Sequence, residues 1–226
     1  MLRRVEPELL DELPAAAPDA IASRRDLRRV NRWMGNAGLM GRMLAGSEAP
    51  RRVIELGAGD GTLLLRLAAQ WPARGPKITA LLIDRHNLVS DQTRREFNAL
   101  GWEVETVQAD VFDWLAQPGP SADWLLANLF LHHFQTQRLR DLLSLAAAKT
   151  MRFVACEPRR APLPLMATRL LRLIDCNAVT RHDARVSVCA GFAGSELSAL
   201  WPQDGRWKLC EKPTGLFSHC FVARRN

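Results

Sequence analysis

Short apolar runs alternate with segments of helix-forming residues from about residue 51 onward. Each apolar run has the length and composition typical of a buried strand. Expected strands cover residues 53–56, 77–84, 103–110, 124–131 and 152–157. Expected helices cover residues 62–69, 90–100, 135–149, 163–175 and 195–200. Strands that alternate with helices in this way predict a mainly parallel sheet with helices on both faces.

The two ends of the chain depart from this alternation. Residues 207–211 and 216–223 both predict strands, and the short gap between them allows only a hairpin. Residues 2–19 are rich in proline and predict an irregular or loosely packed leader, which an amphipathic helix from Ile21, a break at 35–38 and a second short helix follow. We therefore expect an α/β domain at 47–226, doubly wound around a seven-stranded sheet with a C-terminal antiparallel hairpin, and a helical part at 1–46.

A glycine-rich turn follows the first expected strand. The strand ends at Glu55 and breaks into Gly57, Gly59 and Gly61, and helix-forming residues begin directly behind them at Thr62. This succession lets the backbone approach a ligand closely at a helix N-terminus. A dinucleotide-binding fingerprint requires Gly-x-Gly-x-x-Gly, and Thr62 stands where its last glycine belongs. The spacing therefore disfavours a nicotinamide or flavin cofactor.

The same pattern resembles motif I of the class I S-adenosylmethionine-dependent methyltransferases, Glu/Asp-x-Gly-x-Gly-x-Gly. The resemblance covers about residues 51–225 and implies that S-adenosylmethionine is the cofactor. In that family the glycine turn, which here includes Ala58, passes close to the methionine part of the cofactor, and the acid, here Glu55, orients it. Helices before the motif often form a lid, in which Arg32 would pair with the carboxylate of the cofactor. A solvated helix face is the alternative for Arg32.

Further acidic residues follow the next two strands, at the sheet edge where ligands of open parallel sheets bind. The resemblance implies that Asp84 accepts hydrogen bonds from the ribose, with Arg85 beside it. It also implies that Asp110 accepts from the adenine amino group while Val111 contacts the ring. The alternative is that these residues cap helices or lie on the surface. An acid at position 84 also opposes a 2′-phosphate and so disfavours NADP.

Residues 128–134 leave the fourth strand, where the resembling family places the methyl-transfer site. Asn128 and Leu129 are expected to contact the cofactor, and His132 and His133 are the candidate catalytic residues. A hydroxyl acceptor must lose its proton, and an imidazole with an ordinary pKa can take it near neutral pH. Adjacent residues of an extended chain point opposite ways, so we expect one histidine to face the site, with a slight preference for His133. The alternative is that both are structural.

The same stretch argues against a nucleic-acid substrate. Methyltransferases that act on nucleobase or amide nitrogens usually carry Asn/Asp-Pro-Pro-aromatic at this place. This chain has Asn128-Leu129-Phe130-Leu131 instead. The net charge of +7 comes mainly from arginines that are scattered along the chain. Because dispersed arginines do not form a nucleic-acid binding face, no nucleic-acid partner is expected.

Composition sets further limits. With 47% hydrophobic residues, the 226-residue chain can bury the core of a full domain. It contains neither an apolar stretch long enough for a membrane span nor a secretory signal, which favours a cytoplasmic protein. The five cysteines have no Cys-x-x-Cys spacing and predict reduced, mostly buried thiols. Since no cluster of Cys and His ligands is visible, no metal site is expected.

These observations predict an S-adenosylmethionine-dependent methyltransferase that acts on a small, apolar or aromatic acceptor, most simply at oxygen. Glu157, Arg159 and Arg160 follow the fifth strand and could border the acceptor pocket. Residues 177–183 are expected in a loop before the last hairpin. An RNA-modifying methyltransferase and a non-catalytic binding protein that retains the fold are the alternatives. The pattern does not determine the oligomeric state.

Overall fold

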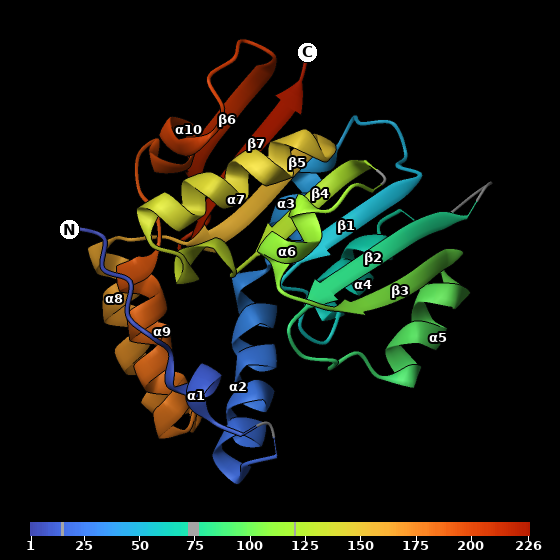
Figure 1. Cartoon of the computed structure of the whole chain (residues 1–226). Coiled ribbons are helices and arrows are strands. Elements are labelled where there is room, and N and C mark those ends of the chain that lie inside the picture. The colour runs from blue at the N-terminus through green and yellow to red at the C-terminus, as the bar shows by residue number, and fades with distance from the viewer. Residues whose placement is uncertain (15, 72–76, 120) are drawn as a thin grey trace.

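The computed structural model describes residues 1–14, 16–71, 77–119 and 121–226. Its centre is a seven-stranded sheet with the strand order β3-β2-β1-β4-β5-β7-β6 (Figure 1). The strands from β1 to β5 are parallel, and β7 runs antiparallel to both β5 and β6. This confirms the predicted mainly parallel sheet with its C-terminal hairpin. The strands are β1 Arg52–Leu56, β2 Ile78–Asp84, β3 Trp102–Gln108, β4 Ala122–Asn128, β5 Thr150–Pro158, β6 Trp207–Thr214 and β7 Ser218–Arg225.

Helices cover both faces of the sheet, as a doubly wound fold requires. One buried cluster joins α6, α7 and α10 to the sheet, and a second joins α3, α4 and α5 to its other face. In β1, Ile54 and Leu56 belong to the first cluster and Val53 to the second, because successive side chains of a strand point to opposite faces. These helices are α3 Asn36–Leu44, α4 Thr62–Ala68, α5 Asp91–Ala99, α6 Val111–Ala116, α7 Thr136–Ala148 and α10 Glu196–Leu200.

The remaining helices gather at one end of the sheet, beyond the carboxyl ends of the parallel strands (Figure 1). We call this group the cap. Helix α9 lies at its centre and packs against α1, α2, α8 and η2. The cap elements are α1 Leu9–Glu12, α2 Pro18–Met34, α8 Pro162–Ala167, the 3-10 helix η2 Thr168–Ile174, and α9 Ala178–Ala190. The N-terminal part therefore shares the cap with residues from the middle of the chain.

Helix α9 corrects the prediction of a loop at residues 177–183. The side chain of Asn177 caps the helix by accepting a hydrogen bond from the backbone N–H of Thr180 at 2.8 Å. Val179 and Val186 lie two turns apart on its buried side. The helix was missed because the polar residues at its start resemble a loop, although Asn is a preferred N-cap residue.

The leader is better packed than its composition predicts. Residues Leu9–Glu12 form α1, and Glu8 is buried directly before it. Arg3 donates hydrogen bonds to the carbonyls of Ala190, His132 and Phe134. These long-range contacts depend on side chains that carry no periodic signal in the sequence, so the prediction of an irregular or loosely packed leader was wrong in this respect.

Two element boundaries also differ from the prediction. Strand β4 ends at Asn128 and does not reach residue 131, because Leu129 has a left-handed backbone (φ 50°) and Leu131–His133 form the 3-10 helix η1. The apolar segment at 163–175 is a short α-helix continued by a 3-10 helix. The five cysteines are free thiols, and Cys156, Cys176 and Cys220 are buried.

Candidate active site

A cavity of about 1090 Å³ lies between the cap and the carboxyl ends of the central strands. From β1 the chain continues to β2 and β3 on one side, whereas β4 and β5 lie on the other side of β1. Open α/β sheets bind ligands at such a change of direction. The cavity brings together most of the residues predicted for the site. They are Arg32, Glu55, Gly57, Ala58, Gly59, Asn128, Leu129, His132 and His133.

The glycine turn forms one wall of the cavity, and its glycines have different surroundings. Gly57 has a left-handed backbone (φ 65°), and a Cβ atom there would lie 2.2 Å from Cδ2 of Phe130. Gly59 is also left-handed (φ 55°), but a Cβ atom there would meet nothing within 4 Å. Gly57 is therefore required by packing, whereas the backbone at Gly59 borders open space that a ligand can fill.

Glu55 supplies a buried carboxyl group to the same wall. Its Oε2 atom is buried and has no hydrogen-bond partner among the described residues. Burial raises the pKa of the Glu55 carboxyl well above its usual range, and the charges of Asp60 and Asp84 raise it further. A buried acceptor without a partner is costly. The α-amino group of S-adenosylmethionine is a donor of the kind this position lacks, so Glu55 and Gly59 both fit that cofactor.

Asp84 holds the glycine turn from the neighbouring strand. Its two oxygens accept hydrogen bonds from the backbone N–H groups of Gly59 and His86, each at 2.8 Å. Asp84 lines a small cleft that adjoins the cavity, with Ala58 and Gly59 common to both. Because each carboxylate oxygen can accept a second hydrogen bond, the position remains compatible with the predicted ribose contact.

Besides Asp84, four predicted cofactor residues do not line the cavity. Asp110 accepts from the backbone N–H of Phe112 and pairs with Arg85 at 2.6 Å, so both of its oxygens are engaged. Val111 is buried in the first core cluster, and Gly61 packs against Leu82. Because each carboxylate oxygen can accept a second hydrogen bond, Asp110 remains compatible with the predicted adenine contact, beside Arg85, whose side chain is 66% exposed.

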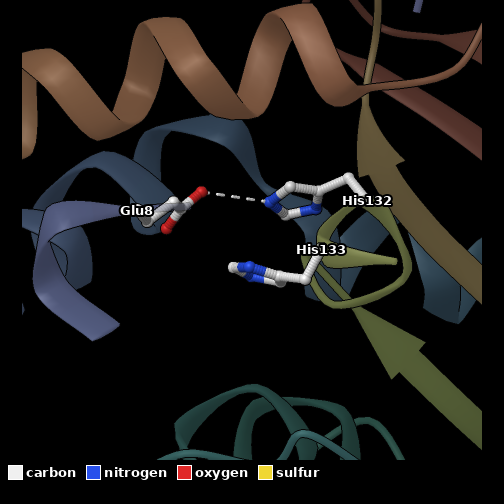
Figure 2. Close-up of side chains that lie close together, drawn as sticks. All are labelled: Glu8, His132 and His133. Atoms are coloured by element: carbon white, nitrogen blue, oxygen red, sulfur yellow. Dashed lines mark hydrogen bonds and ion pairs between the residues drawn. The ribbon is translucent and has the colours of Figure 1, made fainter. Parts of the chain in front are cut away.

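His132 lies in a buried array of opposite charges at the wall of the cavity (Figure 2). Its Nδ1 atom is 2.8 Å from Oε2 of Glu157, and its Nε2 atom is 3.4 Å from Oε1 of Glu8. Burial alone would lower the pKa of His132, but the hydrogen bonds and charges of Glu157 and Glu8 outweigh it and raise the pKa to about 9. His132 is therefore protonated near neutral pH and cannot accept a proton.

The two carboxylates of this array, Glu157 and Glu8, have further partners that fix them in place. Glu157 is fully buried and accepts from the backbone N–H groups of Phe130 and Leu131. Glu8 accepts from the hydroxyl of Ser187 on α9. Burial would raise the pKa of Glu8, but hydrogen bonding and the charge of His132 outweigh it and lower the pKa to about 2. Glu8 was not predicted, because it lies 124 residues from His132 within the leader.

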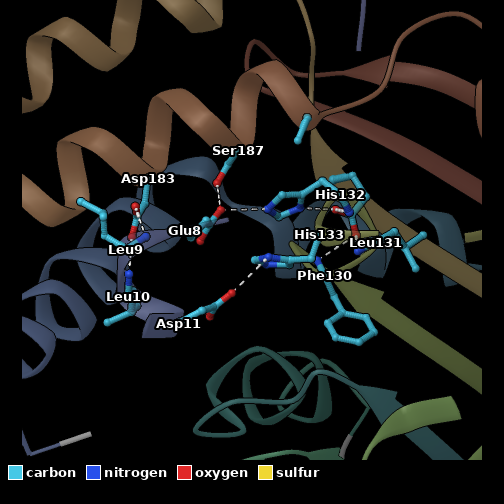
Figure 3. Close-up of polar contacts among 12 residues, drawn as sticks. Glu8, Leu9, Leu10, Asp11, Phe130, Leu131, His132, His133, Asp183 and Ser187 are labelled. Carbon is cyan, nitrogen blue, oxygen red and sulfur yellow. Dashed lines mark hydrogen bonds and ion pairs between the residues drawn. The ribbon is translucent and has the colours of Figure 1, made fainter. Parts of the chain in front are cut away.

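His133 is the partly exposed member of the pair and lines the cavity. Its ring centroid lies 4.3 Å from that of His132, and its Nδ1 atom is 3.6 Å from Oδ2 of Asp11 (Figure 3). Burial lowers the pKa of His133, and the positive charge of His132 lowers it further. The nearby carboxylates of Glu8, Asp11 and Glu157 raise this pKa but do not outweigh the two lowering effects. The structure thus gives the two adjacent histidines opposite roles, one charged and buried, the other neutral and facing the cavity.

Glu8, His132 and His133 also place three potential metal ligands within 4.8 Å of one another. Sequence spacing predicted no such group, because its carboxylate comes from the leader. In the array described above, Nε2 of His132 donates toward Glu8, and the imidazolium charge balances the carboxylates. We therefore assign the group to proton chemistry.

Together, the doubly wound sheet, the terminal hairpin and the ligand-sized cavity at the glycine turn define a class I methyltransferase fold. Residues 53–151 match the family model of the methyltransferase domain. Residues 53–151 therefore carry a methyltransferase domain, as motif I predicted, and the fold around them is that of the class I, S-adenosylmethionine-dependent methyltransferases. A comparison with curated proteins finds no matching sequence.

Solved structures of methyltransferases share the fold at low sequence identity. The plantazolicin methyltransferase BpumL, in complex with S-adenosylhomocysteine, is 12% identical with a TM-score of 0.67, covering 93% of this chain and 92% of its own. An O-methyltransferase family protein from Burkholderia thailandensis is 18% identical with a TM-score of 0.61, covering 94% and 64%. The magnesium protoporphyrin IX methyltransferase from Synechocystis is 14% identical with a TM-score of 0.57, covering 90% and 84%.

Proposed function

We propose that the protein transfers the methyl group of S-adenosylmethionine to an oxygen atom of a small, apolar or aromatic acceptor, with His133 as the general base. The observation that carries this proposal is the pairing of a neutral, cavity-lining imidazole with a buried imidazolium. A base must be unprotonated before the reaction and must reach the acceptor. Of the two histidines, His133 meets both requirements.

The residues around His133 support this role. When bound, S-adenosylmethionine supplies a methyl group already activated by the positive sulfur. His133 would take the hydroxyl proton while the acceptor oxygen bonds to the methyl carbon and the bond between that carbon and sulfur breaks, which leaves S-adenosylhomocysteine. Asp11 faces Nδ1 of His133 at 3.6 Å, so it orients the ring and favours the protonated form that results. His132 stays charged throughout and keeps His133 neutral beforehand.

The size and lining of the cavity support a small apolar acceptor beside the cofactor. Single-ligand pockets generally have volumes of roughly 300–1,000 Å³, so a cavity of about 1090 Å³ has room for a cofactor and an acceptor together. Leu27, Val30, Leu171 and Ile174 of the cap line its outer part. The O-methyltransferase among the similar structures agrees with transfer to oxygen.

The cofactor site can be tested through Glu55. Glu55→Gln is expected to weaken S-adenosylhomocysteine binding by about 1–3 kcal/mol, because the amide oxygen can still accept from the amino group but no longer carries the charge that strengthens this hydrogen bond. Isothermal titration calorimetry measures this change. Glu103→Gln, on the exposed side of β3, is the matched control and should leave the affinity unchanged. Equal affinity for both variants would contradict the predicted role of Glu55.

The acceptor class can be tested by methyl transfer itself. Phenols and their alkylated derivatives are incubated with the enzyme and methyl-labelled S-adenosylmethionine, and mass spectrometry locates the methyl group. We expect O-methylated products, with higher kcat/KM for acceptors with larger apolar substituents. Methylation of a defined tRNA or rRNA position would overturn the proposal in favour of RNA modification. Tight S-adenosylhomocysteine binding without transfer to any member of the panel would favour a binding protein.

A further inference from the structure

The cap segment formed by α8 and η2 is apolar on both of its faces. Its inner face lines the cavity with Pro164, Leu171 and Ile174. Its outer face carries four large apolar side chains three or four residues apart, a spacing that places them on one side of a helix. Their exposed fractions are 52% for Leu163, 63% for Met166, 58% for Leu170 and 79% for Leu173. A cap segment facing water would ordinarily present polar side chains there.

The patch is continuous with the mouth of the cavity. Leu170 is exposed and also lines the cavity. Trp33, at the end of α2, is 62% exposed and lines the cavity as well. Arg29, one turn earlier on α2, donates to the carbonyl of Ile174 and so joins α2 to the end of η2. Exposed apolar residues that line the cavity therefore lie on both α2 and η2, next to the outer face of α8 and η2.

Positive charge accompanies this apolar surface. Arg169 and Arg172 are exposed within η2, between the apolar positions. Arg32 is exposed beside Trp33, and the chain as a whole carries a net charge of +7. Leucine, methionine and tryptophan interleaved with arginine are typical of segments that lie in the headgroup region of a bilayer. No helix in the described part of the chain is long and apolar enough to cross a membrane, so the contact would be with the surface alone.

We propose that the outer face of α8 and η2 docks the protein on an anionic lipid surface, with the mouth of the cavity turned toward the bilayer. An apolar acceptor can then pass from the lipid into the cavity without crossing water. This last step rests on the proposed function, whereas the docking itself does not. A second copy of the chain fits the patch less well, because a symmetric contact would bring Arg169 and Arg172 against their own copies.

Vesicle co-sedimentation of the full chain tests the docking. We expect binding to vesicles of phosphatidylcholine mixed with phosphatidylglycerol, much weaker binding to phosphatidylcholine alone, and a decline as salt concentration rises. The double variant Met166→Asp/Leu173→Asp should lose at least about ten-fold in partitioning, since it places charge in the apolar face. Replacing both Arg169 and Arg172 with glutamine should lose about five-fold for each arginine.

The matched control carries the same substitutions on other exposed apolar residues, Met151→Asp/Leu216→Asp, and should bind vesicles like the unaltered protein. Thermal melting and S-adenosylhomocysteine titration show that each variant is folded. Equal losses in both double variants, or no vesicle binding at all, would overturn the proposal. A dimer in light scattering that Met166→Asp/Leu173→Asp dissociates, without vesicle binding, would assign the patch to a second copy. Vesicle binding is measured without an acceptor, so its failure is separable from failure of the methyl-transfer proposal.

Discussion

Replacing His133 with alanine is expected to lower kcat by about 10²–10⁴-fold, the usual contribution of a positioned proton transfer. Affinity for S-adenosylhomocysteine should change little, because the glycine turn and Glu55 lie on another wall of the cavity. Steady-state kinetics on the true acceptor, with calorimetry on the same preparation, measures both quantities. Near-full turnover in the variant would show that no base is needed, as for a carbon acceptor or an oxygen that is already ionised.

The pH profile gives the same hypothesis a second test. The pKa of His133 lies below the ordinary 6.5, so kcat/KM should stay level near neutral pH and fall only at lower pH, as the ring becomes protonated.

Dialysis against EDTA tests whether the group formed by Glu8, His132 and His133 holds a metal ion. Turnover should be unchanged afterwards. Loss of turnover that zinc or manganese restores would instead assign the group to a metal.

The parts of the site that the sequence predicted are those formed by local patterns. The first strand and the glycine turn together occupy only residues 53–61, and Glu55, Asp84 and Asn128 each follow an apolar run. Parallel strands bring such positions to one edge, so their convergence follows from topology alone. The mainly parallel sheet and the terminal hairpin were predictable in the same way, from local patterns along the chain.

The charged array at the wall of the cavity was not predictable in this way. Glu8 and Asp11 come from a leader without hydrophobic periodicity. Ser187 comes from α9, a helix that was not predicted and whose first residues were expected to form a loop. The contacts of Glu8 and Asp11 with the histidines span more than a hundred residues of sequence. Without these groups nothing in the sequence distinguishes the pKa values of the two histidines, so the sequence could favour His133 only slightly. The structure supplies the reason, which is the charge on its neighbour.

The largest expected loss of stability follows from removing the charge of Glu157. In Glu157→Gln the amide oxygen can still accept from Phe130 and Leu131, but His132 loses a buried counter-ion. Breaking one side of a buried pair costs about 3–5 kcal/mol. For a chain of this size, the melting temperature should fall on the order of 10 °C. Thermal unfolding followed by circular dichroism measures the change.

The pH dependence of that stability has a definite sign. The folded pKa of His132 is about 9, above the ordinary value of 6.5, so the folded state binds the proton more tightly. The contribution is fully present below about pH 6.5 and is lost as pH rises through about 9. The unaltered protein should therefore melt at lower temperature as pH increases over that range. Glu157→Gln should show a smaller dependence, because His132 is then less strongly protonated.

Glu211 offers a matched control for this variant. Like Glu157, its side chain is buried, pairs with a histidine (His219, 2.8 Å) and accepts from two backbone N–H groups, those of Leu197 and Ser198. Glu211→Gln should therefore also lower the melting temperature, but it lies outside the cavity and should leave the pH–rate profile unchanged. In Glu157→Gln the direct loss of the Glu157 charge lowers the pKa of His133, but the weaker charge on His132 is the larger effect and should instead raise that pKa, which moves the fall in kcat/KM to higher pH. If both variants share one pH–rate profile, His132 does not tune the base, and the array serves only to hold the leader against the sheet.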